Sequence, residues 1–167
     1  DNGPGSLREA IALANPPGQI SFLPSLRGTI HLNIQLVINK PLTIVGPGAN
    51  SLAISGDNFT RVLYVDTGGN AAIHGLTLTK GLIVGADGTS PQVSGSRGVG
   101  GCIQNNGVLA LYDCMITENL AQGGRGGFGQ VGGASVYPGT GGLGMGGAIF
   151  NSYRGTLALT RCTLFDN

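Results

Sequence analysis

The sequence contains no tryptophan, and charged residues make up only 10% of its 167 positions. The formal net charge is +1, so the charge balance gives no indication of nucleic acid or an anionic membrane as a partner. A transmembrane segment is not expected, because no run of about 18 apolar residues is present. Three cysteines are too few for a disulfide scaffold, and their odd number leaves at least one thiol unpaired within the chain.

A secretory leader is also missing from the start, which reads DNGPGS in place of a basic and then apolar segment. We expect such a start in a mature or trimmed chain. No stretch between residues 20 and 167 has a convincing helical periodicity. The sequence does contain 32 glycines and 41% hydrophobic residues, which indicates a single domain with a buried apolar core.

A repeated phrase is the most informative feature that is present. GVLALYDCMITEN at 107–119 aligns without gaps with GTLALTRCTLFDN at 155–167, and NAAIHGLTLTKG at 70–81 joins them. Apolar residues alternate on either side of a small turn, which predicts strand, turn and strand. The alignment produces four apolar columns, which are Ala71, Leu109 and Leu157; Ile73, Leu111 and Leu159; Leu76, Cys114 and Cys162; and Leu78, Ile116 and Leu164.

Short strands in a recurring order, without crossover helices, are typical of a solenoid whose turns stack on one another. We therefore predict an all-β fold, a parallel β-helix of about five or six rungs that forms one domain over residues 1–167. An antiparallel sandwich is the competing fold. It needs hairpin turns such as Asn-Gly, and only the pair at 106–107 lies between predicted strands.

The repeats are unevenly spaced, so the extra residues must leave the rungs as excursions. These residues form two Gly-rich segments, 82–99 and 120–145, which we expect to be long loops without regular structure. The second contains GFGQVG, formally a dinucleotide-binding motif. It neither follows a strand of a βαβ unit nor opens a helix, so we reject a dinucleotide site and expect no cofactor.

One short helix is predicted ahead of the β body, at residues 6–15. Ser6 and Glu9 have the spacing of a capping box, and Leu7 and Ile11 share one apolar face. The first rung of a solenoid exposes an apolar interior and a strand edge. We therefore expect this helix to cap the stack.

The stretches GPGSLREAIALAN, PLTIVGPGANSLAISGDN, GGCIQNNGVLALYDCMITEN and GGAIFN resemble the secreted bacterial right-handed parallel β-helix proteins that begin with a Ser-Leu-Arg-Glu-Ala segment. The repeats also resemble those of the polymorphic outer-membrane proteins. The resemblance covers nearly the whole chain outside the Gly-rich segments. It implies a right-handed helix, an extracellular or cell-surface location, and structural or adhesive roles; the wider fold class includes polysaccharide lyases.

The chain departs from this pattern at both ends. Relatives usually have a strand before the Gly-Pro-Gly-Ser run and further repeats after the last asparagine. The sequence therefore suggests either a fragment of a longer surface protein or a subunit whose ends are completed by other chains.

Catalytic chemistry has little support in the sequence. A lyase needs carboxylates for Ca²⁺ and a base beside an acidic sugar, whereas Asp and Glu together number only eight. Asp57, Arg61 and Asp66 form the best remaining polar group. We predict no catalytic residue, no metal site and no enzyme activity, with a polysaccharide lyase as the enzymatic alternative.

Outward positions offer a second candidate site. His74 aligns with Tyr112 and Thr160, and such a column is either a solvated ladder or a set of groups for stacking sugars. His31 alternates with apolar neighbours and is expected on the polar side of a strand. Glycans are accordingly a candidate partner.

Cysteines continue an inward column that begins at Leu76. Adjacent rungs would place the Cα atoms of Cys114 and Cys162 about 4.8 Å apart, which permits a disulfide. Parallel side-chain vectors keep the Cβ atoms farther apart than a bridge prefers. We therefore expect two buried free thiols that act as small apolar groups.

Asparagines form two further columns at the ends of strand phrases. Asn105 aligns with Asn151, and Asn119 aligns with Asn167. Stacked amides can donate and accept hydrogen bonds along a column while tolerating the backbone of a corner. We predict that all four residues are structural.

The phrase at 156–167 leads to a prediction about assembly. Thr163, Leu164 and Phe165 lie on a predicted strand edge with few charges, and the Thr163 N–H is expected to be an unpaired edge donor. Head-to-tail stacking of solenoids gives open filaments when the rotation does not close. We predict a structural or adhesive module that associates with copies of itself into a fibre, with a carbohydrate-binding module as the alternative.

Overall fold

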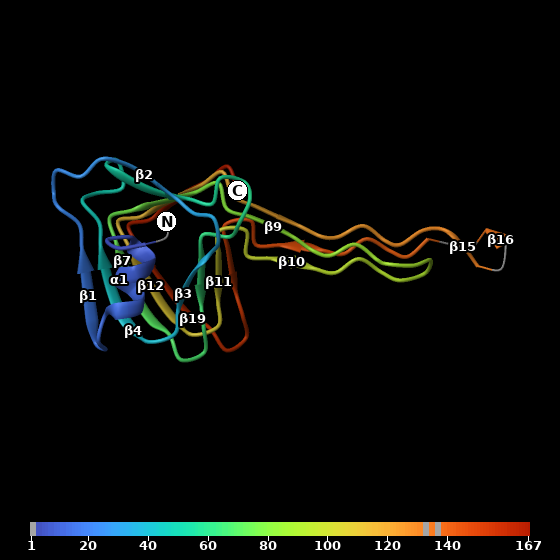
Figure 1. Ribbon diagram of the computed structural model, residues 1–167, viewed down its shortest axis with the longest axis horizontal. Helices are drawn as coiled ribbons and strands as arrows, with labels where there is room; N and C mark the ends of the chain where they lie inside the picture. The colour runs from blue at the N-terminus through green and yellow to red at the C-terminus, as the bar shows by residue number, and fades with distance from the viewer. Residues whose placement is uncertain (1–2, 132–133, 136–137) are drawn as a thin grey trace.

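The computed structural model describes residues 3–131, 134–135 and 138–167. This part of the chain is almost entirely β structure, and three parallel sheets surround a common axis (Figure 1). The chain visits the three sheets in turn, so each circuit adds one strand to each sheet. The fold is therefore a parallel β-helix, as the sequence predicts.

The three long sheets are called faces 1, 2 and 3 in the order in which the chain meets them. Faces 1 and 2 have five strands and face 3 has four, so the stack has five rungs. Face 1 consists of β1 (Gly18–Ser21), β4 (Pro41–Val45), β7 (Asn70–His74), β12 (Val108–Tyr112) and β19 (Thr156–Thr160). Face 2 consists of β2 (Gly28–His31), β5 (Leu52–Ser55), β8 (Thr77–Thr79), β13 (Met115–Thr117) and β20 (Thr163–Phe165). Face 3 consists of β3 (Leu36–Ile38), β6 (Leu63–Val65), β11 (Ile103–Asn105) and β18 (Ile149–Asn151).

The register between rungs follows the repeat in the sequence. Leu111 pairs with Ile73 of the preceding rung and with Leu159 of the following rung. The phrases GGCIQN and GGAIFN are stacked in the same way, since Ile103 pairs with Ile149. The columns predicted from the alignment are thus real columns of the β-helix.

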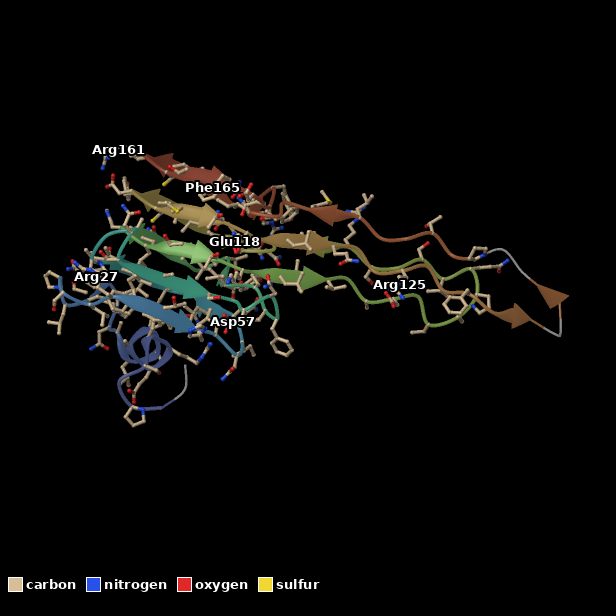
Figure 2. The ribbon with its side chains drawn as sticks, turned by 90° about the horizontal axis from the view of Figure 1, so that it is seen from above. Arg27, Asp57, Glu118, Arg125, Arg161 and Phe165 are labelled. Atoms are coloured by element: carbon tan, nitrogen blue, oxygen red, sulfur yellow. The ribbon has the colours of Figure 1, made fainter. Side chains whose placement is uncertain are left out.

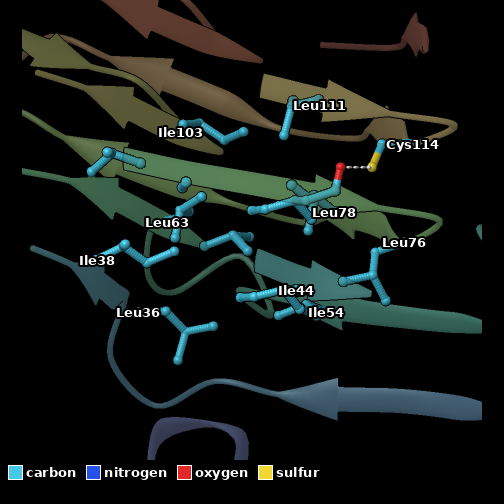
Figure 3. Close-up of a cluster of buried hydrophobic side chains, with 14 of the residues drawn as sticks. Leu36, Ile38, Ile44, Ile54, Leu63, Leu76, Leu78, Ile103, Leu111 and Cys114 are labelled. Atoms are coloured by element: carbon cyan, nitrogen blue, oxygen red, sulfur yellow. Dashed lines mark hydrogen bonds between the residues drawn. The ribbon is translucent and has the colours of Figure 1, made fainter. Parts of the chain in front are cut away.

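Inward side chains from all three faces form one apolar core (Figure 3). Ile38, Leu111 and Ile116 have no exposed surface at all. Full burial of such a side chain contributes about 1.5–3 kcal/mol. The stacked columns therefore supply the main stabilisation of the body.

Helix α1 (Leu7–Leu13) lies at one end of the stack (Figure 2), and it buries Leu7 and Ile11 against the core. Ser6 is the N-cap, and its Oγ accepts a hydrogen bond from the Glu9 N–H at 3.1 Å. The Glu9 carboxylate accepts from the Gly5 N–H at 2.5 Å, one residue before the position that a capping box would use. The helix is shorter than the predicted range of 6–15, because Ser6 and Ala14 are its caps.

The two Gly-rich excursions are not loops without regular structure, and this expectation was wrong. They contain β9 (Leu82–Val84), β10 (Gly98–Val99), β14 (Leu120–Gln122), β15 (Gln130–Val131), β16 (Ala134–Ser135) and β17 (Gly144–Met145). Figure 1 shows them projecting together from the body. We call the two excursions together, residues 82–99 and 120–145, the arm.

Candidate functional site

Asp57, Arg61 and Asp66, the polar group that the sequence singles out, do not form one site. Asp57 lies 2.8 Å from His31 Nδ1 and also accepts a hydrogen bond from the Ser55 hydroxyl. The pKa of Asp57 is lowered, first by the Ser55 hydrogen bond and then by His31. Asp66 instead accepts from the N–H of its neighbour Thr67. These carboxylates belong to separate corners of the rungs.

Arg61 has a structural environment. Its Nε donates to the Gly100 carbonyl and its Nη2 to the Val99 carbonyl, each at 2.7 Å. Its Nη1 donates to Gln35 Oε1 at 2.5 Å. Burial lowers the pKa of Arg61, but the partners are neutral acceptors that satisfy the guanidinium. Arg61 therefore fastens the point where the arm returns to the body.

In residues 3–131, 134–135 and 138–167, no three His, Cys, Asp or Glu side chains are grouped so that they could hold a metal ion. Within the same ranges, no helix is both long enough and apolar enough to cross a membrane.

His74 and Tyr112 lie on adjacent rungs, and their rings are stacked. Their centroids are 4.5 Å apart and their planes differ by 10°. Thr160 follows in the same column, paired with Tyr112. Because each ring covers one face of the other, this pair offers fewer free ring faces to a sugar than two separate rings would.

The cysteines are free thiols, as predicted for Cys114 and Cys162, but the expected burial of Cys162 was wrong. Cys102 and Cys114 are buried, and Cys162 is half-buried. The Cys114 thiol donates to the Tyr112 carbonyl at 3.2 Å, and the Cys162 thiol to the Leu111 carbonyl at 3.4 Å. Burial raises the pKa of Cys102 and of Cys114. The two buried thiols are therefore small apolar groups of the core, and neither has the lowered pKa of a reactive thiol.

The asparagine columns make the amide contacts predicted for them. Asn105 Nδ2 donates to Asn151 Oδ1 at 2.7 Å, and Asn119 Nδ2 donates to Asn167 Oδ1 at 2.7 Å. Asn119 Oδ1 also accepts from the Gly81 N–H at 2.7 Å. These four residues fasten corners of successive rungs.

The interior of the arm consists of backbone rather than side chains. Gly85 and Gly88 of the first excursion donate to the carbonyls of Gln122 and Arg125 in the second, each at 2.8 Å. Gly124 donates back to Ser96 at 2.9 Å. Several glycines are three residues apart, such as Gly85 and Gly88, Gly95 and Gly98, and Gly124 and Gly127, which is the period of an extended helix such as polyproline II. This spacing is a signal in the sequence for an ordered arm, whereas glycine content alone favours a loop without regular structure.

Glycine is required inside the arm for steric reasons. A Cβ atom on Gly124 would overlap the Ala86 carbonyl oxygen, and one on Gly127 would overlap the Ser90 carbonyl oxygen. Since the interior holds only backbone, larger side chains of the arm must lie outside. Phe128 is 82% exposed and Leu143 is 59% exposed. The arm therefore displays apolar side chains away from the body.

The rung formed by β18, β19 and β20 is the most exposed part of the core. These strands are the last members of faces 3, 1 and 2. Leu111 is fully buried, whereas Leu159 in the same column is 43% exposed. Likewise, Ile116 is fully buried and Leu164 is 42% exposed. We call the surface of these three strands the open rung.

The open rung borders a shallow, solvent-open hollow of about 540 Å³. Its apolar lining includes Ile149, Leu157, Leu159 and Leu164. Figure 2 places Phe165 in this rung, at the end of the stack opposite α1. The hollow therefore continues the inward apolar columns of the core at the surface of this rung.

One sequence-based detail of this edge was wrong. The Thr163 N–H is not a free edge donor, because it donates to the Cys114 carbonyl of the preceding rung at 3.0 Å. Successive residues of a strand direct their N–H groups to opposite neighbours. The outward donor of β20 is consequently the N–H of Leu164.

Comparison with known proteins adds no further constraint: no family model, no curated protein and no solved structure matches the chain.

Proposed function

We propose that this chain is a non-catalytic structural or adhesive β-solenoid, extracellular or on the cell surface, which associates with copies of itself through the open rung. The location rests on the resemblance of the Ser-Leu-Arg-Glu-Ala segment and the repeats to secreted β-helix proteins. The observation that carries the self-association is the exposure of Leu159 and Leu164 in columns whose other members are buried.

Strand addition at the open rung would pair backbone groups and bury apolar surface at the same time. Outward N–H and C=O groups of β18, β19 and β20 would gain partners, and the hollow would lose its contact with water. Burial of apolar surface contributes about 25 cal/mol per Å². Charge does little to oppose this, because Arg161 is turned toward Asp113 of the preceding rung, with Nε–Oδ1 and Nη2–Oδ2 distances of 2.6 and 2.7 Å.

The proposal is tested by a matched pair of lysine substitutions on β19. Leu159 lies in an inward column, whereas Ala158 points outward on the same strand and is already exposed. In Leu159→Lys the ammonium can reach water in the monomer but would be buried in an assembly, so association should weaken by about tenfold or more. Ala158→Lys should leave association unchanged.

Sedimentation velocity over a range of concentrations measures the effect, and far-UV circular dichroism checks that both variants fold. A monomeric 167-residue protein at high concentration would overturn the self-association. If native material has a larger intact mass, the same edge receives further rungs of its own polypeptide, which also contradicts pairing between copies.

Carbohydrate binding is a second candidate, favoured by the outward ring pair of His74 and Tyr112. A glycan array with the unmodified protein and with Tyr112→Ala tests it. Binding that is lost in the variant supports a sugar site on face 1. Equal signals for both proteins, or none, remove this candidate.

A further inference from the structure

Cys114 and Cys162 occupy equivalent positions on adjacent rungs. The strands before them, β12 and β19, pair in register, and so do the strands after them, β13 and β20. The Thr163 N–H donates to the Cys114 carbonyl at 3.0 Å, so the backbones are adjacent at this point as well. Both side chains point inward, since Cys114 belongs to the apolar core and Cys162 packs against it. The two cysteines are therefore stacked in one column.

Their sulfur atoms are related in the same way. Cys114 Sγ lies 3.2 Å from the carbonyl oxygen two residues before it and 3.6 Å from the Ile73 carbonyl oxygen of the preceding rung (Figure 3). Cys162 Sγ lies 3.5 Å from the carbonyl oxygen two residues before it and 3.4 Å from that of Leu111, which is the partner of Ile73. Matching contacts imply matching rotamers, so the sulfur atoms are separated by one rung, about 4.8 Å.

This separation fits a metal ion bound in line between two sulfur atoms. A zinc–thiolate bond is about 2.3 Å long, so two bonds of that length in line span about 4.6 Å. Thiolates are soft ligands that suit Cu(I), Zn²⁺ and iron–sulfur clusters. Structural zinc sites and the clusters need four ligands, and the described part of the chain holds no group of three or more His, Cys, Asp or Glu ligands. Cu(I), which accepts two thiolates in line, is the ion that fits this pair.

The surroundings of the pair favour a cation between the sulfur atoms. Burial is the main cause that raises the pKa of Cys114, and the charge of a Cys162 thiolate raises it further, whereas backbone hydrogen bonds lower it. A cation shared by both thiolates removes their mutual repulsion, and a bound metal deprotonates its thiol ligands, so each ion displaces two protons. Leu76, fully buried, continues the column on one side. The exposed corner formed by Asp113 and Arg161 lies directly before the cysteines and gives a short path from solvent.

We propose that Cys114 and Cys162 form a two-coordinate site for a soft monovalent cation, Cu(I), held in line between the sulfur atoms of adjacent rungs. A shortage of ligands in the sequence argues against a metal site, but a two-coordinate site needs only this pair. The bound ion would join two rungs and stabilise the folded chain, because stacking of the rungs creates the site. The site does not depend on the self-association proposed above.

Anaerobic titration with Cu(I) against a colorimetric Cu(I) chelator measures the affinity, and the unmodified protein should bind one ion per chain. Cys162→Ser keeps a hydrogen-bond donor but removes the soft ligand. Its affinity should fall by about 100-fold or more, since loss of a group that merely supports a ligand already costs about 10–100-fold. Cys102→Ala is the matched control, because Cys102 aligns with Ala148 on the next rung and has no stacked thiol. This variant should bind as the unmodified protein does.

X-ray absorption at the copper edge of the unmodified protein should show two sulfur neighbours, and it decides the question even if a variant fails to fold. Sedimentation velocity should give the same mass with and without Cu(I). Affinity that is retained in Cys162→Ser, or that falls equally in Cys102→Ala, would overturn the site. A doubled mass with half an ion per chain would show that two chains contribute one thiol each, and Zn²⁺ binding of equal affinity would show a site with more ligands. Either result also contradicts the proposal.

Discussion

At the scale of single residues, the polar groups of the corners hold neighbouring rungs together. Asn119 is 2% exposed, and its Oδ1 and Nδ2 atoms all have partners. Its Nδ2 also donates to the Thr117 carbonyl at 2.8 Å. A buried amide of this kind connects two rungs through hydrogen bonds that an apolar side chain cannot replace.

Replacing Asn119 with leucine should therefore lower the free energy of unfolding. The change leaves the Gly81 N–H and the Thr117 carbonyl without partners, at a cost of about 1–3 kcal/mol for each buried group. Urea denaturation monitored by circular dichroism measures the loss. Asn119→Asp keeps an acceptor for Gly81 but turns a charged oxygen toward the Thr117 carbonyl in a buried site, so it should be at least as destabilising at neutral pH. An unchanged unfolding midpoint for Asn119→Leu would contradict a structural role for the column.

Asp113 and Arg161 form an exposed ion pair between neighbouring rungs, and its contribution to stability depends on pH. The Arg161 hydrogen bonds, and then its charge, lower the pKa of Asp113. Because the folded-state pKa lies below the unfolded value, the stabilisation is fully present above the unfolded pKa, and it is lost as pH falls through the folded pKa. Both side chains are exposed, so this contribution is small.

An NMR titration of the Asp113 carboxyl checks this effect. In Arg161→Gln the pKa of Asp113 should rise toward its ordinary value of about 3.9. Asp57 provides the internal control, because its pKa is lowered by Ser55 and His31 and should not move. Identical titration of Asp113 in both proteins would show that the ion pair does not form in solution.

At the scale of elements, the residues that point inward recur with a different sequence period in the rungs and in the arm. In the rungs every second residue points inward, so the interior is made of side chains such as Leu111 and Ile116. In the arm, glycines three residues apart, such as Gly85 and Gly88 or Gly124 and Gly127, leave an interior of peptide groups that hydrogen-bond between segments. The arm is thus an ordered element with its own packing rule.

A single alanine should disrupt the arm without unfolding the body. In Gly124→Ala the new methyl group would overlap the Ala86 carbonyl oxygen, whereas the nearest atom to a Cβ on Gly141 is at an ordinary 3.7 Å. We expect Gly124→Ala to increase hydrogen exchange and protease cleavage within the arm several-fold, and Gly141→Ala to have little effect. Body strands such as β12 should keep their protection in both variants. Equal protection of the arm in Gly124→Ala would show that its segments are not packed in this way.

Helix α1 is an element that its neighbours stabilise. Seven residues are too few for an independently stable helix in water. Its contacts to the body compensate, since Leu7 and Ile11 are buried and Lys40 Nζ donates to the Ala12 and Ala14 carbonyls at 2.9 and 2.7 Å. The cap and the first rungs therefore depend on each other.

At the scale of the whole molecule, the β-helix combines a stack of rungs, a helix against the first rung and one arm. Helix α1 packs Leu7 and Ile11 against the core, the open rung exposes Leu159 and Leu164, and the arm leaves the corner opposite face 1. The arm also carries exposed apolar side chains, such as Phe128.

Much of the β-helix could be predicted from the sequence by itself, because neighbouring rungs repeat one pattern. The pairing of Leu111 with Leu159, the Asn105–Asn151 contact and the N-cap at Ser6 all follow from local spacing. In a solenoid each rung touches only its neighbours, so alignment of the repeats is already a map of contacts. The free state of Cys114 followed from the same geometry.

Only the tertiary structure determined the order of the arm, the role of Arg61 and the direction of the Thr163 N–H. The glycines of the arm are ordered by hydrogen bonds between residues far apart in the sequence, from Gly139–Gly127 to Gly98–Leu143, and composition alone does not show which segments meet. Arg61 is close to Asp57 and Asp66 in the sequence, but its hydrogen-bond partners include the carbonyls of Val99 and Gly100. These features depend on contacts between different columns and excursions, which the repeat does not encode.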